Sequence, residues 1–243
     1  MTQRAALVTG GSRGIGAAIA LRLATDGYDV AISYASNEKA AADIVSKIEA
    51  KGRKAVAIKA NGGTAEGNRV VVTKAVETFG RLDALVCNAG IYPYGPIGQM
   101  TVEQIDQVLN LNVRAVMIET MEAVKHLGQG GRLIYIGSAF GARAPFPGIS
   151  LYSATKAALE GFARGVARDV GPKGITVNVV EPGPIDTDLN PADGEGAALI
   201  SSFTATNSYG KVADIADFVG FLASPAASYI TGASLPVDGG LTA

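Results

Sequence analysis

The fold is decided by the stretch Ala5-Ala6-Leu7-Val8-Thr9-Gly10-Gly11-Ser12-Arg13-Gly14-Ile15-Gly16. A short apolar run meets a glycine cluster there, and apolar residues recur at helical spacing after Ile15. Such a turn lets the backbone approach a phosphate closely, and free N–H groups at the helix N-terminus meet its charge. The glycines fall at 10, 11, 14 and 16, so the literal G-x-G-x-x-G spacing is absent. The strand, turn and helix together still predict a dinucleotide-binding unit.

The rest of the chain continues this alternation of strands and amphipathic helices. Strands are predicted over residues 5–9, 29–34, 54–59, 84–87, 133–136, 176–180 and 234–237. Helices are predicted over residues 15–25, 38–50, 65–79, 101–127, 152–170 and 213–222. This order predicts parallel strands joined by right-handed crossovers. We therefore expect an α/β single-domain Rossmann fold over residues 1–243, a doubly wound parallel sheet of about seven strands with helices on both faces.

Composition excludes several classes of protein. The 243 residues include 21 basic and 22 acidic side chains, and this balance argues against broad binding of nucleic acid or anionic membranes. The single cysteine, Cys87, excludes a disulfide framework and a multi-cysteine metal site. No apolar run approaches the roughly 18 residues that span a bilayer. The first ten residues lead into the glycine motif and do not resemble a signal peptide, so we expect a cytoplasmic protein without a metal.

Three side chains have the chemistry that carbonyl reduction needs. Tyr152 and Lys156 are four residues apart on a predicted helix and therefore share a face. A neighbouring ammonium stabilises a phenolate and is expected to lower the pKa of Tyr152. Ser138 follows a predicted strand, where open α/β sheets bind ligands, and its hydroxyl is placed to stabilise a developing alkoxide. Asn110 and Asn112 lie in a predicted helix, where asparagine is unfavourable and asks for a reason.

These motifs, with others in the same order along the chain, resemble those of the short-chain dehydrogenase/reductase family, in particular its 3-oxoacyl-carrier-protein-reductase-like branch. The shared motifs are Thr9-Gly10-x-x-x-Gly14-x-Gly16, Asn88-Ala89-Gly90, Asn110, Ser138, Tyr152-x-x-x-Lys156, Pro182-Gly183 and Ser228-Tyr229-Ile230-Thr231-Gly232 before Asp238-Gly239-Gly240. The resemblance implies that Asn110, Ser138, Tyr152 and Lys156 are catalytic. It implies that Asn110 holds a water that relays protons to Lys156, and Asn110-Leu111 fits the family register better than Asn112 does.

The residues that follow the second predicted strand favour NADP(H) over NAD(H). No carboxylate is available there to bind a ribose 2′-hydroxyl until Glu38, and Arg13 in the glycine turn is placed to meet a 2′-phosphate. Ser36 and Asn37 supply further polar groups to that pocket. The cofactor-binding residues expected from the motifs and the resemblance are Gly10, Ser12, Arg13, Gly14, Ile15, Gly16, Tyr34, Ser36, Asn37, Asn61, Asn88, Ala89, Gly90, Tyr152, Lys156, Pro182, Gly183, Ile185 and Thr187.

Two positions depart from the family pattern. Asn61 stands where an aspartate commonly contacts the adenine, and its side-chain oxygen retains the ability to accept a hydrogen bond. Cys87 replaces the first asparagine of the usual Asn-Asn-Ala-Gly run, so one structural hydrogen bond is expected to be missing.

Three stretches are expected to wall a mostly apolar substrate pocket: residues 91–97, residues 139–148 and a mobile lid near residues 189–209. The predicted substrate is a small-molecule ketone or aldehyde, with a 3-oxoacyl thioester among the candidates. The alternative is a nucleotide sensor, because Gly183–Asp188 and Asn190–Ala192 also resemble a bacterial biofilm-dispersal member of the family considered a cyclic-di-GMP binder. An isomerase or epimerase is disfavoured, since such relatives carry a larger substrate domain. The resemblance also implies a homotetramer, or a homodimer.

Overall fold

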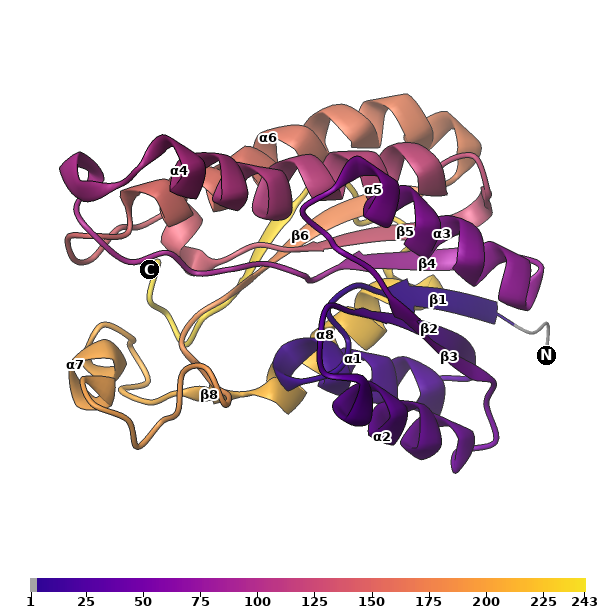
Figure 1. Cartoon of the computed structure of the whole chain (residues 1–243), viewed down its shortest axis with the longest axis horizontal. Coiled ribbons are helices and arrows are strands. Elements are labelled where there is room, and N and C mark those ends of the chain that lie inside the picture. The colour runs from indigo at the N-terminus through magenta and orange to yellow at the C-terminus, as the bar shows by residue number, and fades with distance from the viewer. Residues whose placement is uncertain (1–3) are drawn as a thin grey trace.

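A computed structural model describes residues 4–243 as a parallel sheet covered by helices on both faces (Figure 1). The sheet has seven strands in the order β3-β2-β1-β4-β5-β6-β9. Their bounds are Arg4–Val8 (β1), Tyr28–Tyr34 (β2), Ala55–Lys59 (β3), Leu82–Cys87 (β4), Leu127–Ile136 (β5), Thr176–Pro182 (β6) and Ser234–Val237 (β9). The predicted doubly wound α/β fold is confirmed.

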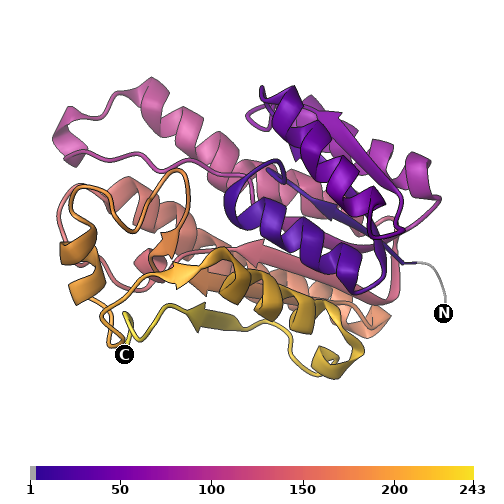
Figure 2. The same cartoon turned by 90° about the horizontal axis from the view of Figure 1, so that it is seen from below.

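The helices form one layer on each side of the sheet. One layer contains α1 (Gly14–Thr25), α2 (Glu38–Glu49) and α8 (Val212–Ala223), and Figure 2 shows α1 and α8 side by side. The other contains α3 (Ala65–Phe79), α4 (Val102–Leu109), α5 (Ala115–Ala123) and α6 (Ser150–Val170). The strands are buried on both faces, so their side chains divide between two apolar cores, with Ile32 in one and Leu133 in the other.

The order of the strands reverses between β1 and β4, because β2 follows β1 toward one edge and β5 follows β4 toward the other. A crevice at the carboxyl ends of the strands beside such a switch point is where open α/β sheets bind their ligands. The glycine turn after β1 and the Asn88-Ala89-Gly90 turn after β4 both begin at this point.

The long helix predicted over residues 101–127 differs from the structure in two ways. Its start is as expected, because Thr101 and Gln104 form a capping box. A π-helical turn at Asn110–Arg114 interrupts it between α4 and α5, and α5 ends at Ala123. The strand predicted from residue 133 begins earlier, at Leu127, and its pairing register with β4 shifts across its glycine-rich opening. Glycine lacks the side chain on which the apolar pattern of a strand depends, so no sequence pattern indicates these first residues of β5.

The segment predicted as a lid contains a short helix and several anchors. It includes α7 (Ala197–Ser202) and lies between the two-residue strands β7 (Ile185–Asp186) and β8 (Gly210–Lys211), which pair with each other. Figure 2 shows α7 beside the carboxyl-terminal end of the chain, and the Thr206 amide donates to the Gly239 carbonyl at 3.1 Å. Among residues 4–243, no helix is long and apolar enough to cross a membrane.

Candidate active site

The glycine turn after β1 is shaped by close contact with the turn after β4. A Cβ on Gly16 would lie 2.5 Å from both the Gly10 carbonyl oxygen and Nδ2 of Asn88, so only glycine fits there. Gly14 has a φ of 54°, and the nearest atom to a Cβ on it is Cγ2 of Thr187 at 3.7 Å. The turn is thus packed on its inner side and open toward Thr187, which is the arrangement a bound pyrophosphate requires.

The residues predicted to choose between cofactors lie beside this turn. Arg13 is the exposed N-cap residue of α1, and Ser36 is exposed after β2. Asn37 is also exposed, but its side-chain oxygen is engaged, since it caps α2 by accepting from the Ala40 amide at 3.0 Å. Tyr34 is buried at the end of β2. The structure therefore leaves the Arg13 guanidinium and the Ser36 hydroxyl open to a phosphate.

A hollow of about 370 Å³ continues this crevice past the end of β3. Its lining comprises Ala35, Asn61, Gly62, Gly63, Thr64, Gln107, Asn110 and Leu111. Oδ1 of Asn61 accepts from the Gly63 amide at 2.9 Å and keeps a second lone pair for a ligand. Asn61, where an adenine contact was expected, therefore lies in a hollow with other polar groups.

The turn after β4 is fastened to the glycine turn by hydrogen bonds. The Asn88 side chain donates to the carbonyl of Thr9 at 3.0 Å and to that of Gly10 at 3.3 Å. In return, the Thr9 hydroxyl accepts from the backbone amides of Asn88 and Ala89 at 3.1 and 3.2 Å. The side-chain nitrogen of Asn88 is thus occupied by backbone carbonyls of the glycine turn, and this side chain shapes the crevice floor.

Ser138, Tyr152 and Lys156 come together at the carboxyl end of β5. The hydroxyl of Ser138 and the phenol of Tyr152 are hydrogen-bonded. Nζ of Lys156 is buried, donates to the Ile136 carbonyl at 2.8 Å and lies 5.6 Å from the centroid of the Tyr152 ring. Side chains from the β5 end and from two turns of α6 therefore form one cluster beside the crevice.

The electrostatics of this cluster differ from the expectation for Tyr152. Burial raises the pKa of Tyr152, a hydrogen bond from Ser138 acts in the opposite direction, and Lys156 is not among the groups that lower it. Burial also lowers the pKa of Lys156 to about 8. The prediction that Lys156 depresses the pKa of Tyr152 is therefore wrong for this structure, because desolvation of the phenol outweighs it.

The structure places Asn112, and not Asn110, at this cluster. Asn112 is 1% exposed, donates to the Ile91 carbonyl and accepts from the Ile91 amide, both at 2.9 Å, and also donates to the Thr155 hydroxyl at 3.3 Å. A Cβ on Gly90 would lie 3.2 Å from Oδ1 of Asn112 and 3.9 Å from Nζ of Lys156, so both side chains border the Gly90 turn. Asn110 lines the hollow beside Asn61 instead. The register chosen for Asn110 is corrected, since the π-helical turn rotates Asn112 toward the sheet.

The loop after β6 closes the crevice from the other side. Gly183 approaches so near to the backbone of Asp238 that a Cβ would lie 2.6 Å from its Cα. Pro182 and Ile185 are buried, while Thr187 faces the glycine turn. Thr187 and Asn190 exchange backbone hydrogen bonds at 3.0 and 3.3 Å, which fold the loop back on itself. The four residues predicted from this loop thus border the crevice.

Aromatic side chains join the three stretches predicted to wall the substrate pocket. Tyr92 meets the ring of Tyr152 edge-on, with centroids 4.8 Å apart. Phe146 packs against Phe140 at 5.4 Å and stacks on Phe203 of the predicted lid at 6.0 Å. Arg143, considered as a partner for a substrate anion, donates instead to the carbonyl of Leu241. Tyr92 thus borders Tyr152, and Phe140, two residues after Ser138, begins an aromatic group that reaches the predicted lid.

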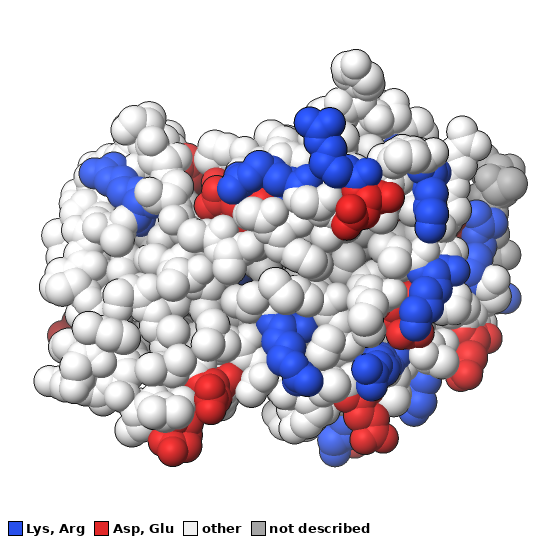
Figure 3. All heavy atoms as spheres, turned by 90° about the horizontal axis from the view of Figure 1, so that it is seen from above, with Lys and Arg blue, Asp and Glu red and all other residues white. Residues whose placement is uncertain are grey.

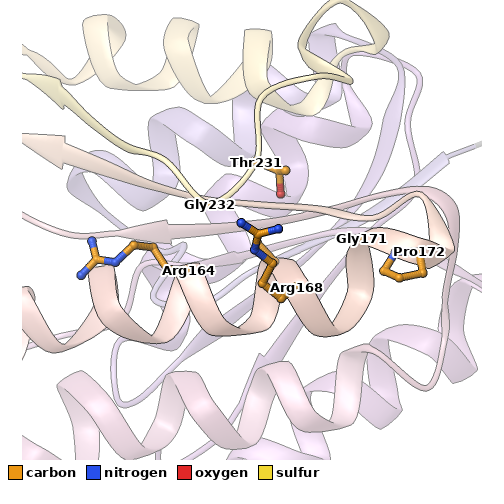
Figure 4. A pocket seen from close by; sticks show the side chains of 7 residues that line it. Arg164, Arg168, Gly171, Pro172, Thr231 and Gly232 are labelled. Carbon is orange, nitrogen blue, oxygen red and sulfur yellow. The ribbon is translucent and has the colours of Figure 1, made fainter.

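A second hollow, of about 620 Å³, lies away from this cluster (Figure 4). Arg164, Arg168 and the Thr231-Gly232 segment line it at the amino ends of β6 and β9, opposite the ends where ligands bind. Arg164 is also 3.7 Å from Glu160. Among residues 4–243, no group of three or more His, Cys, Asp or Glu side chains is arranged to hold a metal ion.

Two residues of the crevice floor were missed by the sequence analysis. The Ser33 hydroxyl accepts from the Gly10 amide at 3.1 Å, and Glu119 is buried beneath Thr9. A serine in a buried strand gives no signal of its own. A carboxylate on the inner face of an apolar helix does give one, because charged side chains are rarely buried.

Comparison with known proteins gives consistent results. A family model described as enoyl-(acyl carrier protein) reductase matches residues 10–242. The cyclic-di-GMP-binding biofilm dispersal mediator protein of Escherichia coli is 42% identical, over 98% of this chain and 97% of that protein. A probable tetrahydroxynaphthalene reductase of Zymoseptoria tritici is 38% identical, over 97% and 93%.

A solved structure agrees over the whole chain. The crystal structure of a short chain dehydrogenase from Burkholderia cenocepacia in complex with NADP superposes with a TM-score of 0.97 at 51% identity, covering 99% of this chain and 98% of that one. Agreement of this extent, together with the crevice and the Ser138–Tyr152–Lys156 cluster, places the chain in the short-chain dehydrogenase/reductase family of NAD(P)-dependent oxidoreductases.

Proposed function

We propose that the protein is an NADPH-dependent carbonyl reductase that acts on a ketone or aldehyde. The observation that carries the proposal is the contact of Ser138 with Tyr152 above the buried amine of Lys156, at the carboxyl end of β5. The NADP-bound short chain dehydrogenase and the reductase among the relatives support it.

The crevice fits a dinucleotide on its own geometry. The packed inner side of the glycine turn would seat a pyrophosphate, and the hollow beside Asn61 and Asn110 would take the adenine. Arg13 and Ser36 would meet a 2′-phosphate, and the 182–187 loop would border the nicotinamide. Bound there, NADPH supplies the hydride for the carbonyl carbon.

The side chains of the cluster bind the carbonyl oxygen of the substrate and supply the proton that it receives. Ser138 polarises the carbonyl by donating a hydrogen bond to its oxygen. Tyr152 gives up the proton of its phenol to the developing alkoxide. Lys156, with its pKa of about 8, carries a positive charge below that pH and places a cation beside the phenol, although burial of the phenol still dominates the pKa of Tyr152. Asn112 borders the same Gly90 turn as the amine and holds the Ile91 backbone, so it keeps this side of the cluster in place.

Replacement of Tyr152 tests the proton donor. In Tyr152→Phe the ring remains and the acidic hydroxyl is lost, so we expect kcat to fall by roughly 10²- to 10⁴-fold while NADPH binding is retained. The assay is NADPH oxidation with a panel of carbonyl compounds, and Tyr229→Phe is the matched control because Tyr229 is fully exposed. Wild-type turnover in Tyr152→Phe would overturn the assignment.

The two asparagines are separated by a pair of alanine variants. Asn112→Ala leaves the Ile91 amide and carbonyl without partners, so we expect a loss of about 1–3 kcal/mol in stability and a fall in kcat. Asn110→Ala should change the KM for NADPH and leave kcat near wild type, because Asn110 lines the adenine hollow. Urea unfolding and steady-state kinetics measure both effects, and the reverse pattern would restore Asn110 to the catalytic cluster.

Cofactor preference tests the role of Arg13. We expect kcat/KM with NADPH to exceed that with NADH, and Arg13→Ala to lower the NADPH value by roughly tenfold or more through loss of a charge-assisted hydrogen bond. The NADH value should stay unchanged. Arg81→Ala is the control, since Arg81 pairs with Asp83 at the amino end of β4. A wild-type preference for NADH would contradict the proposal.

The aromatic side chains of the three predicted walls favour a flat or hydrophobic ketone. These are Tyr92, Phe140, Phe146 and Phe203, and one relative is named a tetrahydroxynaphthalene reductase. The substrate panel should therefore include aryl ketones and diketones beside a 3-oxoacyl thioester. We further propose that the segment over residues 189–209 closes over the bound substrate, with Phe203 and Tyr209 as its anchors.

The name of the Escherichia coli relative supplies a second candidate, a binder of cyclic-di-GMP. In this chain two polar side chains of the 186–190 segment are engaged with their own loop, because Asp186 accepts from the Ala192 amide and Asn190 donates to the Ile185 carbonyl. Isothermal titration with cyclic-di-GMP separates the candidates: tight binding without carbonyl-dependent NADPH oxidation would favour the sensor.

We also propose that the chain assembles into a homotetramer or homodimer through α4 and α5. Val102, Leu109, Met117 and Met121 are exposed along these helices. Figure 3 looks onto the side of the molecule that carries α4, α5 and α6 and shows few charged side chains over its left half. A double variant, Met117→Glu with Met121→Glu, should place charges in this interface and lower the mass measured by light scattering. An unchanged mass above that of one chain would show that another surface holds the assembly.

A further inference from the structure

A buried carboxyl group lies directly beneath the crevice floor. Glu119 on α5 is 3% exposed, and its nearest polar partners lie at the carboxyl ends of β1 and β4. The groups that hydrogen-bond to it are the Cys87 thiol and the Thr9 hydroxyl. The mechanism proposed above does not use this side chain, and a buried carboxyl without a function would only cost stability.

The surroundings of Glu119 disfavour the charged form of its carboxyl. Burial raises the pKa of Glu119 to about 7, which the hydrogen bonds from Cys87 and Thr9 offset only in part. The titratable groups that face it are Cys87 on β4 and Tyr135 on β5, and both have pKa values raised by burial. No lysine or arginine of residues 4–243 is among the groups acting on it. The carboxyl is therefore protonated below pH 7 and ionised above it.

Thr9 connects this carboxyl to the cofactor crevice. Its hydroxyl oxygen already accepts from the amides of Asn88 and Ala89, so the hydroxyl hydrogen is left to donate, and the Glu119 carboxyl is the acceptor. The direction of the Thr9 hydroxyl thus depends on Glu119. The same hydroxyl holds the turn that contains Gly90, next to Lys156 and Asn112.

Cys87 explains why such an acceptor is present. It occupies the position where an asparagine would usually tie the two turns together, and its thiol is a weak hydrogen-bonding group. The carboxyl of Glu119 contacts both Cys87 and Thr9 from the neighbouring helix. The hydrogen bond expected to be missing is therefore supplied from α5.

We propose that Glu119 is a positioning residue that accepts the hydrogen bond of the Thr9 hydroxyl and so fixes the cofactor-binding turn, and that its ionisation weakens the binding of the anionic cofactor. A negative charge on Glu119 would lie beneath the site that receives the cofactor phosphates, without a cation to balance it. Binding of NADPH and protonation of Glu119 then favour each other. The inference rests on the proposed NADPH site.

The central experiment compares the wild type with Glu119→Gln, whose amide has the same shape and stays neutral. The Kd for NADPH is measured by fluorescence from pH 5.5 to 9, so that titration of the 2′-phosphate affects both proteins equally. Above pH 7 we expect the wild-type Kd to rise relative to that of the variant, by about tenfold for each unit by which NADPH raises the pKa of Glu119. Glu122→Gln, on the same helix and paired with Lys125, should follow the wild type.

Unfolding of the protein without cofactor gives an independent readout. Because the carboxyl is protonated in the folded chain and ionised in the unfolded chain between about pH 4.5 and 7, wild-type stability falls as pH rises through that window. The urea midpoint of Glu119→Gln minus that of the wild type should therefore rise between pH 5 and 7 and remain constant above pH 7.

Thr9 variants test the connection to the crevice. Thr9→Ser keeps the hydroxyl and should bind NADPH like the wild type, whereas Thr9→Val should bind it more weakly at every pH. Parallel pH profiles for the wild type and Glu119→Gln, or equal affinity in both Thr9 variants, would overturn the inference. Absence of NADPH binding in every protein, wild type included, would instead count against the proposed function.

Discussion

The structure depends on the fastening of two turns at the point where the strand order reverses. The Asn88 side chain donates to the carbonyls of Thr9 and Gly10, and the Thr9 hydroxyl accepts from the amides that follow β4. These bonds hold the two turns so close that Gly16 has no room for a Cβ. Backbone N–H groups are then directed at one place, which allows a chain with no excess of positive charge to bind an anionic cofactor.

Around these two turns the fold buries polar side chains, and each of them has a hydrogen-bond partner that offsets the cost of burial. Lys156 donates a hydrogen bond to the Ile136 carbonyl, and the Asn112 side chain is hydrogen-bonded to the amide and the carbonyl of Ile91. Glu119 faces Thr9 and Cys87. Removal from water shifts the pKa of Lys156 down to about 8 and that of Glu119 up to about 7, so both groups titrate near neutral pH. The apolar layers that surround them make these shifts possible.

Much of the site was predictable because its residues lie in short motifs. Tyr152 and Lys156 share a helical face by spacing alone, and Ser138 lies at a strand end by pattern alone. Asn110 shows where such reasoning fails: it was chosen because Asn110-Leu111 fitted the family register, whereas the π-helical turn buries Asn112. The opening of β5 was missed for a related reason, since its glycines carry no pattern and the strand is held there by pairing with β4.

The order of apolar runs, glycines and helical faces was enough to determine the doubly wound sheet, because each element must bury one face and parallel strands require crossovers. The glycine spacing likewise determined the phosphate turn. Only the tertiary structure decided which asparagine joins the catalytic cluster, what Arg143 contacts, and that Glu119 lies under Thr9. These outcomes depend on contacts between segments far apart in sequence, and burial sets the charge of a side chain only after those contacts exist.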